Sequence, residues 1–534
     1  MELSADYVVV GAGSSGCVLA RRLAESGASV ILVEAGRGDR SPWLRRPGLI
    51  AILHSVPRLK KIYDWGYYSI PQAAALGRAI PQVRGKVLGG SSSINGMVFV
   101  RGHRKNYDDW AEQGCRGWSY DDVLPSFKRF ECWEDGATDY RGADGPIKVT
   151  RARNVTGATW AFMAALTETA GVKQLEDYNA ESQEGVGLLQ QNASGGLRYS
   201  AAGGHLGTPL PGLTVVLGTL VTGVTIQKGR AIGITVSGRG GPRTIRAVRE
   251  VILCAGVFGS AQLLQLSGVG PADHLRSLGI NVRADLPVGD NLHDHLFVPM
   301  SYLMPSARNR GTASYFASGL TREVLRRGST WVSRSVFEAV AFVRSSRARD
   351  VPDIQLHALP WSYPSPNQDL PVRYRVDPRP HLTLLATMIY PRSRGRVRLA
   401  SADPAQAPVI DPAYLSDPDD TRLLLEAMQL VRQTMASRTI ASEVNGETAP
   451  GPDYRHRDDL AEQIPNRATT VYHPVGTCRM GVDERSVVGP DLRVNGIMGL
   501  RVADASIMPS ITGGNTNAPA LMIGEHAARI ILRS

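Results

Sequence analysis

A chain of 534 residues and 57.6 kDa is too long for one simple core, so we expect two domains or one domain with large insertions. Its 43% hydrophobic and 20% charged residues are globular values. The net charge of +11 suits an anionic partner. However, the arginines are scattered and no basic tract is interleaved with aromatic residues, which argues against nucleic acid and leaves peripheral membrane contact open.

No apolar run is long enough to cross a bilayer, since the longest candidates, around residues 251–269, are broken by Gly, Ser and Gln. The N-terminus carries Glu2 and Asp6 and enters a strand pattern at once, which is unlike a secretory signal. The five cysteines are widely spaced and lack metal-ligand spacing. We therefore expect a cytoplasmic protein with reduced thiols, no transmembrane segment and no metal site.

The first β-α-β unit, residues 6–36, predicts a dinucleotide site. An apolar run of strand length, residues 6–10, is followed by Gly11-Ala-Gly-Ser-Ser-Gly16 and by a helical pattern over residues 17–26. A second strand, residues 29–33, comes next. In such a unit the helix N-terminus offers free N–H groups and a partial positive charge to phosphates.

Four residues of this unit have specific roles in a dinucleotide site. Gly11 permits the tight turn, Gly13 lets the backbone approach a pyrophosphate, and Gly16 lets helix and strand pack closely. Glu34 ends the second strand, where an acidic residue accepts hydrogen bonds from the adenosine ribose. The fingerprint alone does not separate FAD from NAD.

After Glu34 the sequence is irregular, and we expect residues 38–80 to be an excursion from the nucleotide domain, a lid or an interface segment. The block Gly89-Gly-Ser-Ser-Ser-Ile-Asn95 follows. Its glycines and serines supply N–H groups and hydroxyls that can lie against a pyrophosphate or a polar planar ring. Taken alone, the block is equally compatible with an ordinary loop.

Regular patterns continue up to residue 299. Residues 107–133 predict a helical pair with acidic first turns. Three segments predict strands that return to the nucleotide sheet: residues 213–217, 231–236 and 244–253. Residues 255–260 open a further helix. The sheet is therefore expected to be assembled from distant pieces of the chain.

Residues 300–464 have a different character. Apolar alternation predicts three strands of one antiparallel sheet: residues 354–359, 382–390 and 395–399. A helix over residues 419–435 is expected to pack on this sheet, and we expect the whole part to form the wall that faces the substrate. Its loops hold three aromatic residues that either contact substrate or pack: Trp331, Trp361 and Tyr363.

The C-terminal segment carries candidate chemistry. His473 directly precedes a proline, which holds its backbone extended and can present the imidazole to a cavity. Residues 499–504 predict a strand that ends in an acidic turn. Pro519 suits the first turn of the final helix, so the simplest interpretation of Thr516 or Asn517 is an N-cap.

Spaced blocks in this order resemble the glucose-methanol-choline (GMC) oxidoreductases over nearly all of residues 5–531. They are the glycine fingerprint, the Gly-Gly-Ser-Ser-Ser-Ile-Asn block, residues 255–270, His473-Pro-Val-Gly-Thr and Asn515-Thr-Asn517. The resemblance implies FAD rather than NAD and the oxidation of an alcohol. It also implies an α/β FAD-binding domain of Rossmann type plus a discontinuous α+β substrate domain with an antiparallel sheet.

The resemblance divides the chain discontinuously. The FAD-binding domain is expected to comprise residues 1–150, 196–299 and 465–534, with residues 38–80 as a lid-like excursion. The substrate domain is expected to comprise residues 151–195 and 300–464.

The resemblance also implies the cofactor contacts. Glu34 would hold the adenosine ribose, Val221 would lie beside adenine, and Asn95 would lie near the reactive edge of the flavin. The other implied contacts are Gly11, Gly13, Ser14, Ser15, Gly16, Ala35, Arg84, Val87, Gly89, Gly90, Ser91, Gly96, Met97, Val98, Ala255, Gly256, Asp504, Ala505, Asn515, Thr516 and Pro519. Members with covalently attached flavin can bear a histidine where this chain has Ile94, so we expect FAD to bind noncovalently.

His473 matches the catalytic histidine of the family, and Asn517 falls where members carry a second histidine or an asparagine. We expect His473 to take the hydroxyl proton of a primary alcohol, with hydride passing to flavin N5 and Asn517 hydrogen-bonding the same oxygen. The product would be the aldehyde, and O₂ or a quinone-like acceptor would take the electrons. Two alternatives remain: a lyase like the family's hydroxynitrile lyases, with FAD that is not reduced, and a flavin-binding protein without turnover.

Overall fold

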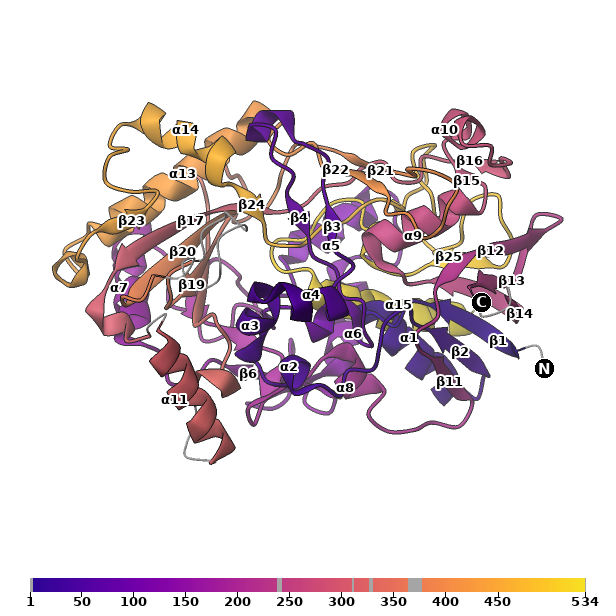
Figure 1. Ribbon diagram of the computed structural model, residues 1–534, viewed down its shortest axis with the longest axis horizontal. Coiled ribbons are helices and arrows are strands. Elements are labelled where there is room, and N and C mark those ends of the chain that lie inside the picture. Colours follow the sequence, from indigo (N-terminus) through magenta and orange to yellow (C-terminus); the bar gives the residue numbers. More distant parts are fainter. Residues whose placement is uncertain (1–2, 238–242, 310–311, 326–329, 364–376, 534) are drawn as a thin grey trace.

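A computed structural model describes residues 3–237, 243–309, 312–325, 330–363 and 377–533. Within these residues the two largest sheets each have seven strands, and they lie toward opposite ends of an elongated molecule (Figure 1). One is mostly parallel and the other is antiparallel, which confirms the predicted fold class. No helix in the described ranges is long and apolar enough to span a membrane.

The mostly parallel sheet is assembled from distant pieces of the chain, as predicted. Its centre is β1 (Leu3–Val10), which pairs in parallel with β2 (Val30–Val33) and β14 (Arg243–Leu253). The remaining strands extend these: β11 (Leu213–Val216) beside β2, β25 (Leu500–Val502) beside β14, and the antiparallel β13 (Arg230–Val236) and β12 (Val221–Gln227). The apolar runs of the two central strands β1 and β2 are buried on both faces of the sheet, whereas β11 at its edge is only partly buried.

Three helices follow strands of this sheet at one edge. They are α1 (Ser14–Glu25) after β1, α9 (Gly256–Leu266) after β14, and α15 (Asn517–Arg533) in the C-terminal segment. Ser15 Oγ donates to the carbonyl of Ala520 at 2.7 Å, so the start of α15 packs on the start of α1. The predicted helical pair is α5 (Arg104–Glu112) and α6 (Tyr120–Phe130).

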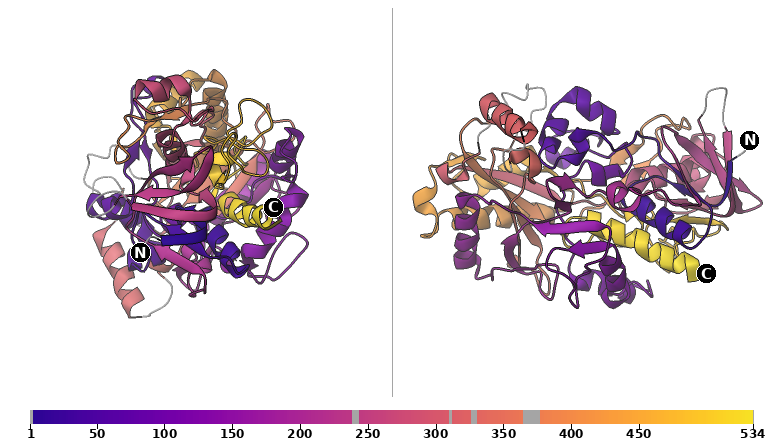
Figure 2. Two further views of the ribbon diagram at one scale, coloured as in Figure 1. Left: turned by 90° about the vertical axis from the view of Figure 1, so that its right-hand side faces the viewer. Right: turned by 90° about the horizontal axis from the view of Figure 1, so that it is seen from below.

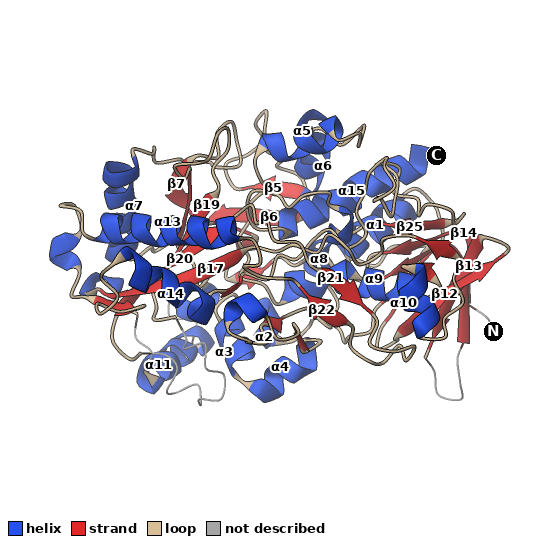
Figure 3. Ribbon diagram, turned by 90° about the horizontal axis from the view of Figure 1, so that it is seen from above, coloured by secondary structure: helices blue, strands red, loops and turns tan. Residues whose placement is uncertain are grey.

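The antiparallel sheet lies toward the other end of the molecule (Figure 1). Its central strands are β17 (Leu296–Leu303), β20 (His381–Met388), β19 (Ile354–Leu359) and β18 (Ala339–Val343), flanked by β7 (Gly185–Leu188), β23 (Glu447–Ala449) and β24 (Thr469–Thr470). Helices α7 (Gly157–Ala170) and α13 (Pro418–Met435) pack on one face of the sheet (Figure 3). Alternation along β20 sends Leu384 and Ala386 toward these helices and Leu385 into the cavity on the other face.

One expectation about this part of the chain is wrong. The strand predicted over residues 395–399 does not join the antiparallel sheet: β21 (Arg396–Arg398) pairs only with β22 (Val409–Asp411), because Gly395 lies against the backbone of Asp411 and Pro412. The expectation that residues 38–80 form an excursion from the nucleotide domain stays a prediction, but the segment is partly helical. It contains α2 (Pro42–Arg45), α3 (Leu49–Ser55) and α4 (Pro57–Tyr63), of which α2 and α4 begin with a proline that suits a first helical turn.

The predicted domain boundaries stay a prediction. Strand β7, within residues 151–195, pairs with β18 of the antiparallel sheet, as the division requires. Strand β24 also pairs with that sheet, although residues 465–534 were assigned to the FAD-binding domain. The chain therefore crosses between the two sheets close to residue 470.

A buried histidine beside α1 predicts a pH-dependent stability. His205 ends α8 (Ala201–His205), is 2% exposed, and neither ring nitrogen has a hydrogen-bond partner among the described residues. Burial lowers its pKa to about 3. The unfolded chain binds a proton at this residue near pH 6.5 and the folded chain does not, so stability falls as pH drops from about 6.5 toward 3, by about 1.4 kcal/mol per pH unit.

We therefore expect His205→Leu to stabilise the protein, and to do so by about 2 kcal/mol more at pH 5 than at pH 7.5. Urea unfolding midpoints of the two proteins at both pH values measure this difference. The control is His456→Leu, which removes an exposed histidine at a helix start and therefore tests the same substitution without the burial of the imidazole. An identical effect of His205→Leu at both pH values would contradict the assignment.

Candidate active site

A cavity of about 1230 Å³ is lined by residues of both large sheets. This exceeds the roughly 300–1,000 Å³ of an ordinary small-ligand pocket. Its volume therefore suits a ligand of dinucleotide size with a second, smaller molecule beside it.

The glycine fingerprint forms one end of the cavity. Gly11 has a φ of 97°, and a Cβ on it would lie 2.5 Å from the carbonyl oxygen of Cys254. A Cβ on Gly16 would lie 2.0 Å from the carbonyl oxygen of Gly11, so both positions exclude any larger residue. Gly13 precedes α1 without a side-chain cap, and a Cβ on it would make only an ordinary contact of 3.9 Å with the carbonyl oxygen of Cys254. The first-turn N–H groups of α1 are thus available to an anion such as a pyrophosphate.

Glu34 lies at the end of β2 with 6% of its surface exposed, and it lines the cavity. Its carboxylate accepts hydrogen bonds from the N–H groups of Ala12 at 3.0 Å and Gly36 at 2.7 Å. Burial raises the pKa of Glu34 to about 7, although the hydrogen bonds from Ala12 and Gly36 act to lower it. Hydroxyl donors from a ribose would favour its charged form, so the position fits the predicted role.

The Gly89 to Asn95 block folds back over the fingerprint. Gly89 N–H donates to the carbonyl of Ala12 at 2.7 Å, and a Cβ on Gly90 would lie 2.7 Å from Cα of Gly13. Asn95 Oδ1 accepts from Arg198 at 2.6 Å and from Met97 N–H at 3.1 Å. The block is therefore a fixed part of the cavity wall and not an ordinary loop.

Nearly all residues predicted for the site line this one cavity. Four do not: Gly16, Val87, Gly89 and Pro519. Gly16 and Gly89 are needed for backbone packing, and Val87 is fully buried among Leu53, Val83 and other apolar side chains. The pattern of glycines and small residues therefore located the cavity but did not separate wall residues from those just behind the wall.

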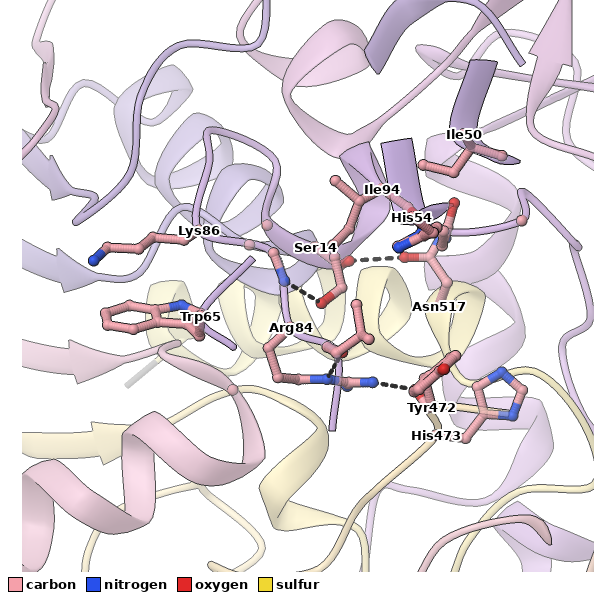
Figure 4. A pocket seen from close by; sticks show the side chains of 18 of the residues that line it. Ser14, Ile50, His54, Trp65, Arg84, Lys86, Ile94, Tyr472, His473 and Asn517 are labelled. Carbon is pink, nitrogen blue, oxygen red and sulfur yellow. Dashed lines mark hydrogen bonds between the residues drawn. The ribbon is translucent and has the colours of Figure 1, made fainter. Parts of the chain in front are cut away.

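His473 is held in the wall by its backbone. Tyr472 has a φ of 68°, and its carbonyl accepts a hydrogen bond from the guanidinium of Arg84 (Figure 4). His473 N–H donates to Asp294 Oδ1 at 2.8 Å. Asp294 is itself buried and also accepts from Tyr414 Oη at 2.6 Å. These contacts aim the imidazole at the cavity, which His473 lines.

Both ring nitrogens of His473 have partners. Nδ1 lies 3.1 Å from Nδ1 of His295, and Nε2 lies 3.1 Å from Nδ2 of Asn515. Asn515 Oδ1 accepts from Gln355 Nε2 at 3.1 Å and lies 3.2 Å from His357 Nε2, so its Nδ2 is the group that faces His473. This pattern assigns the proton of His473 to Nδ1 and leaves Nε2 with a lone pair.

Burial lowers the pKa of His473 well below 6.5, with smaller contributions from His295, His357 and Arg84. Burial also lowers the pKa of His295 to about 3 and that of His357 to about 4. All three imidazoles are therefore neutral near pH 7. A neutral His473, whose Nε2 lone pair faces the amide of Asn515, can accept a proton from a hydroxyl that comes within reach of Nε2.

Asn517, predicted to be the partner of His473, makes different contacts. Its Oδ1 accepts from Ser14 Oγ at 2.8 Å, and its Nδ2 is buried without a hydrogen-bond partner among the described residues (Figure 4). It is the first residue of α15, and the carbonyl of Thr516 accepts from Ala520 N–H at 3.0 Å. The hydrogen bonds thus favour Asn515 as the partner of His473 and leave Asn517 as a donor toward the fingerprint end of the cavity.

Several residues that line the cavity or contact its lining were not predicted from the sequence: His54 and His357 line it, and Asp294, His295 and Gln355 lie behind it. Asp294 and His295 follow Asn291-Leu-His293, and this run of polar residues at the start of a buried strand was a signal that could have found them. Gln355 and His357 alternate with apolar residues on β19, which places both on its cavity face. His54 of α3 lines the cavity and lies 2.8 Å from the carbonyl oxygen of Ile94.

The three aromatic residues for which the sequence left substrate contact and packing open, Trp331, Trp361 and Tyr363, all line the cavity, and substrate contact stays a prediction. Trp361 stacks on Phe316 with ring centroids 5.6 Å apart, and Phe316 meets Trp331 edge to face at 5.2 Å. The end of the cavity away from the fingerprint is therefore a firm aromatic wall.

The dinucleotide site fits FAD. The uncapped start of α1, Glu34, and the unpartnered Nδ2 of Asn517 present donors and acceptors along one cavity whose volume exceeds that of a small-ligand pocket. Asp504 binds the N–H of Gly256 at 2.9 Å and Ser260 Oγ at 2.6 Å, which holds the start of α9 at the same cavity.

Comparison with known proteins agrees with this geometry. Two sequence profiles described as GMC oxidoreductase match residues 5–297 and 391–524. The oxygen-dependent choline dehydrogenase of Rhizobium johnstonii is 40% identical over 99% of this chain and 96% of its own length, and that of Sinorhizobium medicae is 39% identical over the same shares. The crystal structure of pyridoxine 4-oxidase from Mesorbium loti has a TM-score of 0.87 and 30% identity, with 99% of each chain covered. A fungal aryl-alcohol oxidase, at 24% identity and a TM-score of 0.83 over 100% of this chain and 99% of its own, shares the fold.

Proposed function

Because this chain belongs to the GMC oxidoreductase family, whose members act on alcohol-type substrates, we propose that it oxidises a primary alcohol to the aldehyde with FAD as cofactor. One observation carries this proposal. His473 and Asn515 line the same cavity as the glycine fingerprint, and Nε2 of His473 faces the amide of Asn515.

We propose that specific residues hold FAD noncovalently. Glu34 would bind the adenosine ribose, the first turn of α1 would bind the pyrophosphate, and residues 90–97 with Asn517 would contact the flavin. Ile94 offers no nucleophile for a covalent bond. When bound, FAD supplies the hydride acceptor that alcohol oxidation requires.

The side chains of the protein then handle the proton. A substrate hydroxyl within reach of His473 can donate to Nε2, and the same oxygen can accept a hydrogen bond from Asn515 Nδ2. As the proton moves to Nε2, Nδ1–H keeps its hydrogen bond to His295, and the Asn515 amide stabilises developing charge on the oxygen. We therefore assign the base role to His473 and the second role to Asn515 in place of Asn517.

A compact alcohol suits the cavity, because the mutually packed rings of Phe316, Trp331 and Trp361 line it. Relatives are named for choline and pyridoxine, so both belong in a substrate panel together with benzyl alcohol and a simple aliphatic alcohol. O₂ or a quinone-like molecule is the proposed electron acceptor, and the word oxygen-dependent in the name of the choline relatives makes O₂ the first to test.

An anaerobic screen with this panel tests the proposal. We expect one or more alcohols to bleach the yellow flavin absorbance, and admission of air to restore it if O₂ is the acceptor. Product without bleaching would instead indicate a lyase on the same fold. Bound flavin with neither bleaching nor product across the panel would leave a binding protein without turnover and refute the proposal.

A further inference from the structure

Two segments that are distant in the sequence build one face of the molecule, which we call the basic face. They are residues 37–63, with helices α2 to α4, and the described residues 308–309, 312–325 and 330–334, with α11 (Ala313–Val324) and the short helix η4 (Trp331–Ser333). Figures 2 and 3 show α11 and the α2–α4 helices at the same edge of the molecule, from below and from above.

The two segments hold each other in place. Gly48 N–H donates to the carbonyl of Val332 at 2.9 Å, and Arg46 forms an ion pair with Glu323 at 3.0 Å. A Cβ on Gly48 would lie 1.9 Å from the carbonyl oxygen of Trp331, so the backbones are in direct contact. The basic face is therefore one continuous surface.

The excess positive charge of the protein is concentrated in these segments. Residues 37–63 hold seven Lys or Arg against one acidic residue, and the described residues of the second segment hold Arg308, Arg322 and Arg334 against Glu323. The described cations that are exposed on this face are Arg37, Arg40, Arg45, Arg58, Lys61, Arg308 and Arg322.

Apolar side chains project from the same face. On α11, Tyr315 and Phe316 turn inward to line the cavity, whereas Leu320, Val324 and Leu325 are 36%, 80% and 53% exposed. Helix α4 has no buried residue, and its Ile62 is 39% exposed. Apolar residues at a protruding helix end, surrounded by cations, are typical of helices that lie in a membrane interface.

We propose that the basic face docks on an anionic lipid bilayer, with Val324, Leu325 and Ile62 in the interfacial layer and the cations over the lipid headgroups. A bilayer of anionic lipids is both charged and apolar at its surface. A nucleic acid or an acidic soluble protein offers the charge alone and leaves the exposed apolar side chains in water. Because Ile50, Phe316 and Trp331 of these segments line the cavity, docking places one wall of the active-site cavity at the bilayer.

Sedimentation of the flavin-loaded protein with vesicles tests this proposal independently of any alcohol oxidation. Vesicles of phosphatidylcholine mixed with phosphatidylglycerol should bind the protein at least about tenfold more tightly than phosphatidylcholine alone, and added salt should weaken the binding. Val324→Asp and the double variant Arg58→Glu/Lys61→Glu should each reduce the binding by about tenfold or more.

Matched controls lie at the far end of the molecule. Val248→Asp changes a valine of β14 that is 68% exposed, and Lys228→Glu changes an exposed lysine in the turn between β12 and β13 (Figure 1). Both should bind as the wild type does. Absence of binding to the anionic vesicles, or unchanged binding by Val324→Asp, would overturn the proposal. Binding to double-stranded DNA that survives Val324→Asp would assign the face to an acidic macromolecule and would also overturn it.

Discussion

His473→Ala is expected to lower kcat/KM for the preferred alcohol by a factor of about 10²–10⁴, because a positioned general base contributes an effect of that size. The variant should still bind FAD, since the contacts of the fingerprint and Glu34 do not involve the imidazole. Steady-state rates and the flavin absorbance of the same preparation measure both properties. Near-normal turnover in a flavin-loaded variant would refute the base role.

The pH profile gives a second readout of the same residue. His473 must be neutral to accept a proton, and burial lowers its pKa below 6.5. The rate in the wild type should therefore be constant near neutral pH and fall only as pH drops through a value below 6.5. Loss of this acid limb in His473→Ala, with the limb kept in His526→Gln, would assign it to His473, because His526 packs against Trp118 away from the cavity.

Two further variants distinguish the catalytic roles of Asn515 and Asn517. Asn515→Ala removes the amide that faces Nε2 of His473, and Asn517→Ala removes the acceptor of Ser14 Oγ. We expect Asn515→Ala to lower the rate of anaerobic flavin reduction by more than Asn517→Ala does. The opposite order would return the second catalytic role to Asn517, where the family resemblance had placed it.

Glu34→Ala is the second substitution for which we expect a large effect. It leaves the buried N–H groups of Ala12 and Gly36 without an acceptor and removes the acceptor for a ribose. The unsatisfied donors lower the stability of the free and the bound protein alike, whereas a lost hydrogen bond from the ribose to a charged carboxylate costs binding about 1.5–3 kcal/mol, so the Kd for FAD should rise by about 10–10²-fold. Fluorescence titration of deflavinated protein with FAD measures this change.

Glu25→Ala is the matched control, because Glu25 lies at the other end of α1 and pairs on the surface with Arg21 and Arg22. Its Kd for FAD should equal that of the wild type. If Glu34→Ala bound FAD within about twofold of the wild type, the adenosine end of the site would have to lie elsewhere.

Local patterns predicted those elements whose geometry depends on neighbouring residues. The strand, turn, helix and strand of the first unit lie where expected, because Gly11 and Gly16 occupy positions that no larger side chain can take. Alternating apolar residues likewise predicted β19 and β20, since a strand buries every second side chain against α7 and α13.

The same patterns failed where distant segments decide the outcome. The short strand β21 has an apolar pattern that suits either sheet, and its partner β22 is selected by close backbone contact at Gly395. The helices of residues 38–80 were not expected, because each is shorter than two full turns of clear periodicity and they are completed by contacts with α11 and η4.

The sequence by itself determined that the chain has a dinucleotide fingerprint ending on an acid, two sheets of different character, and a histidine held extended by the proline after it. These features need only short-range sterics and side-chain periodicity. Only the tertiary structure decided that Asn515 and not Asn517 faces His473. The choice depends on contacts between residues more than 150 positions apart in the sequence. Ser14 donates to Asn517, whereas Gln355 and His357 contact Asn515.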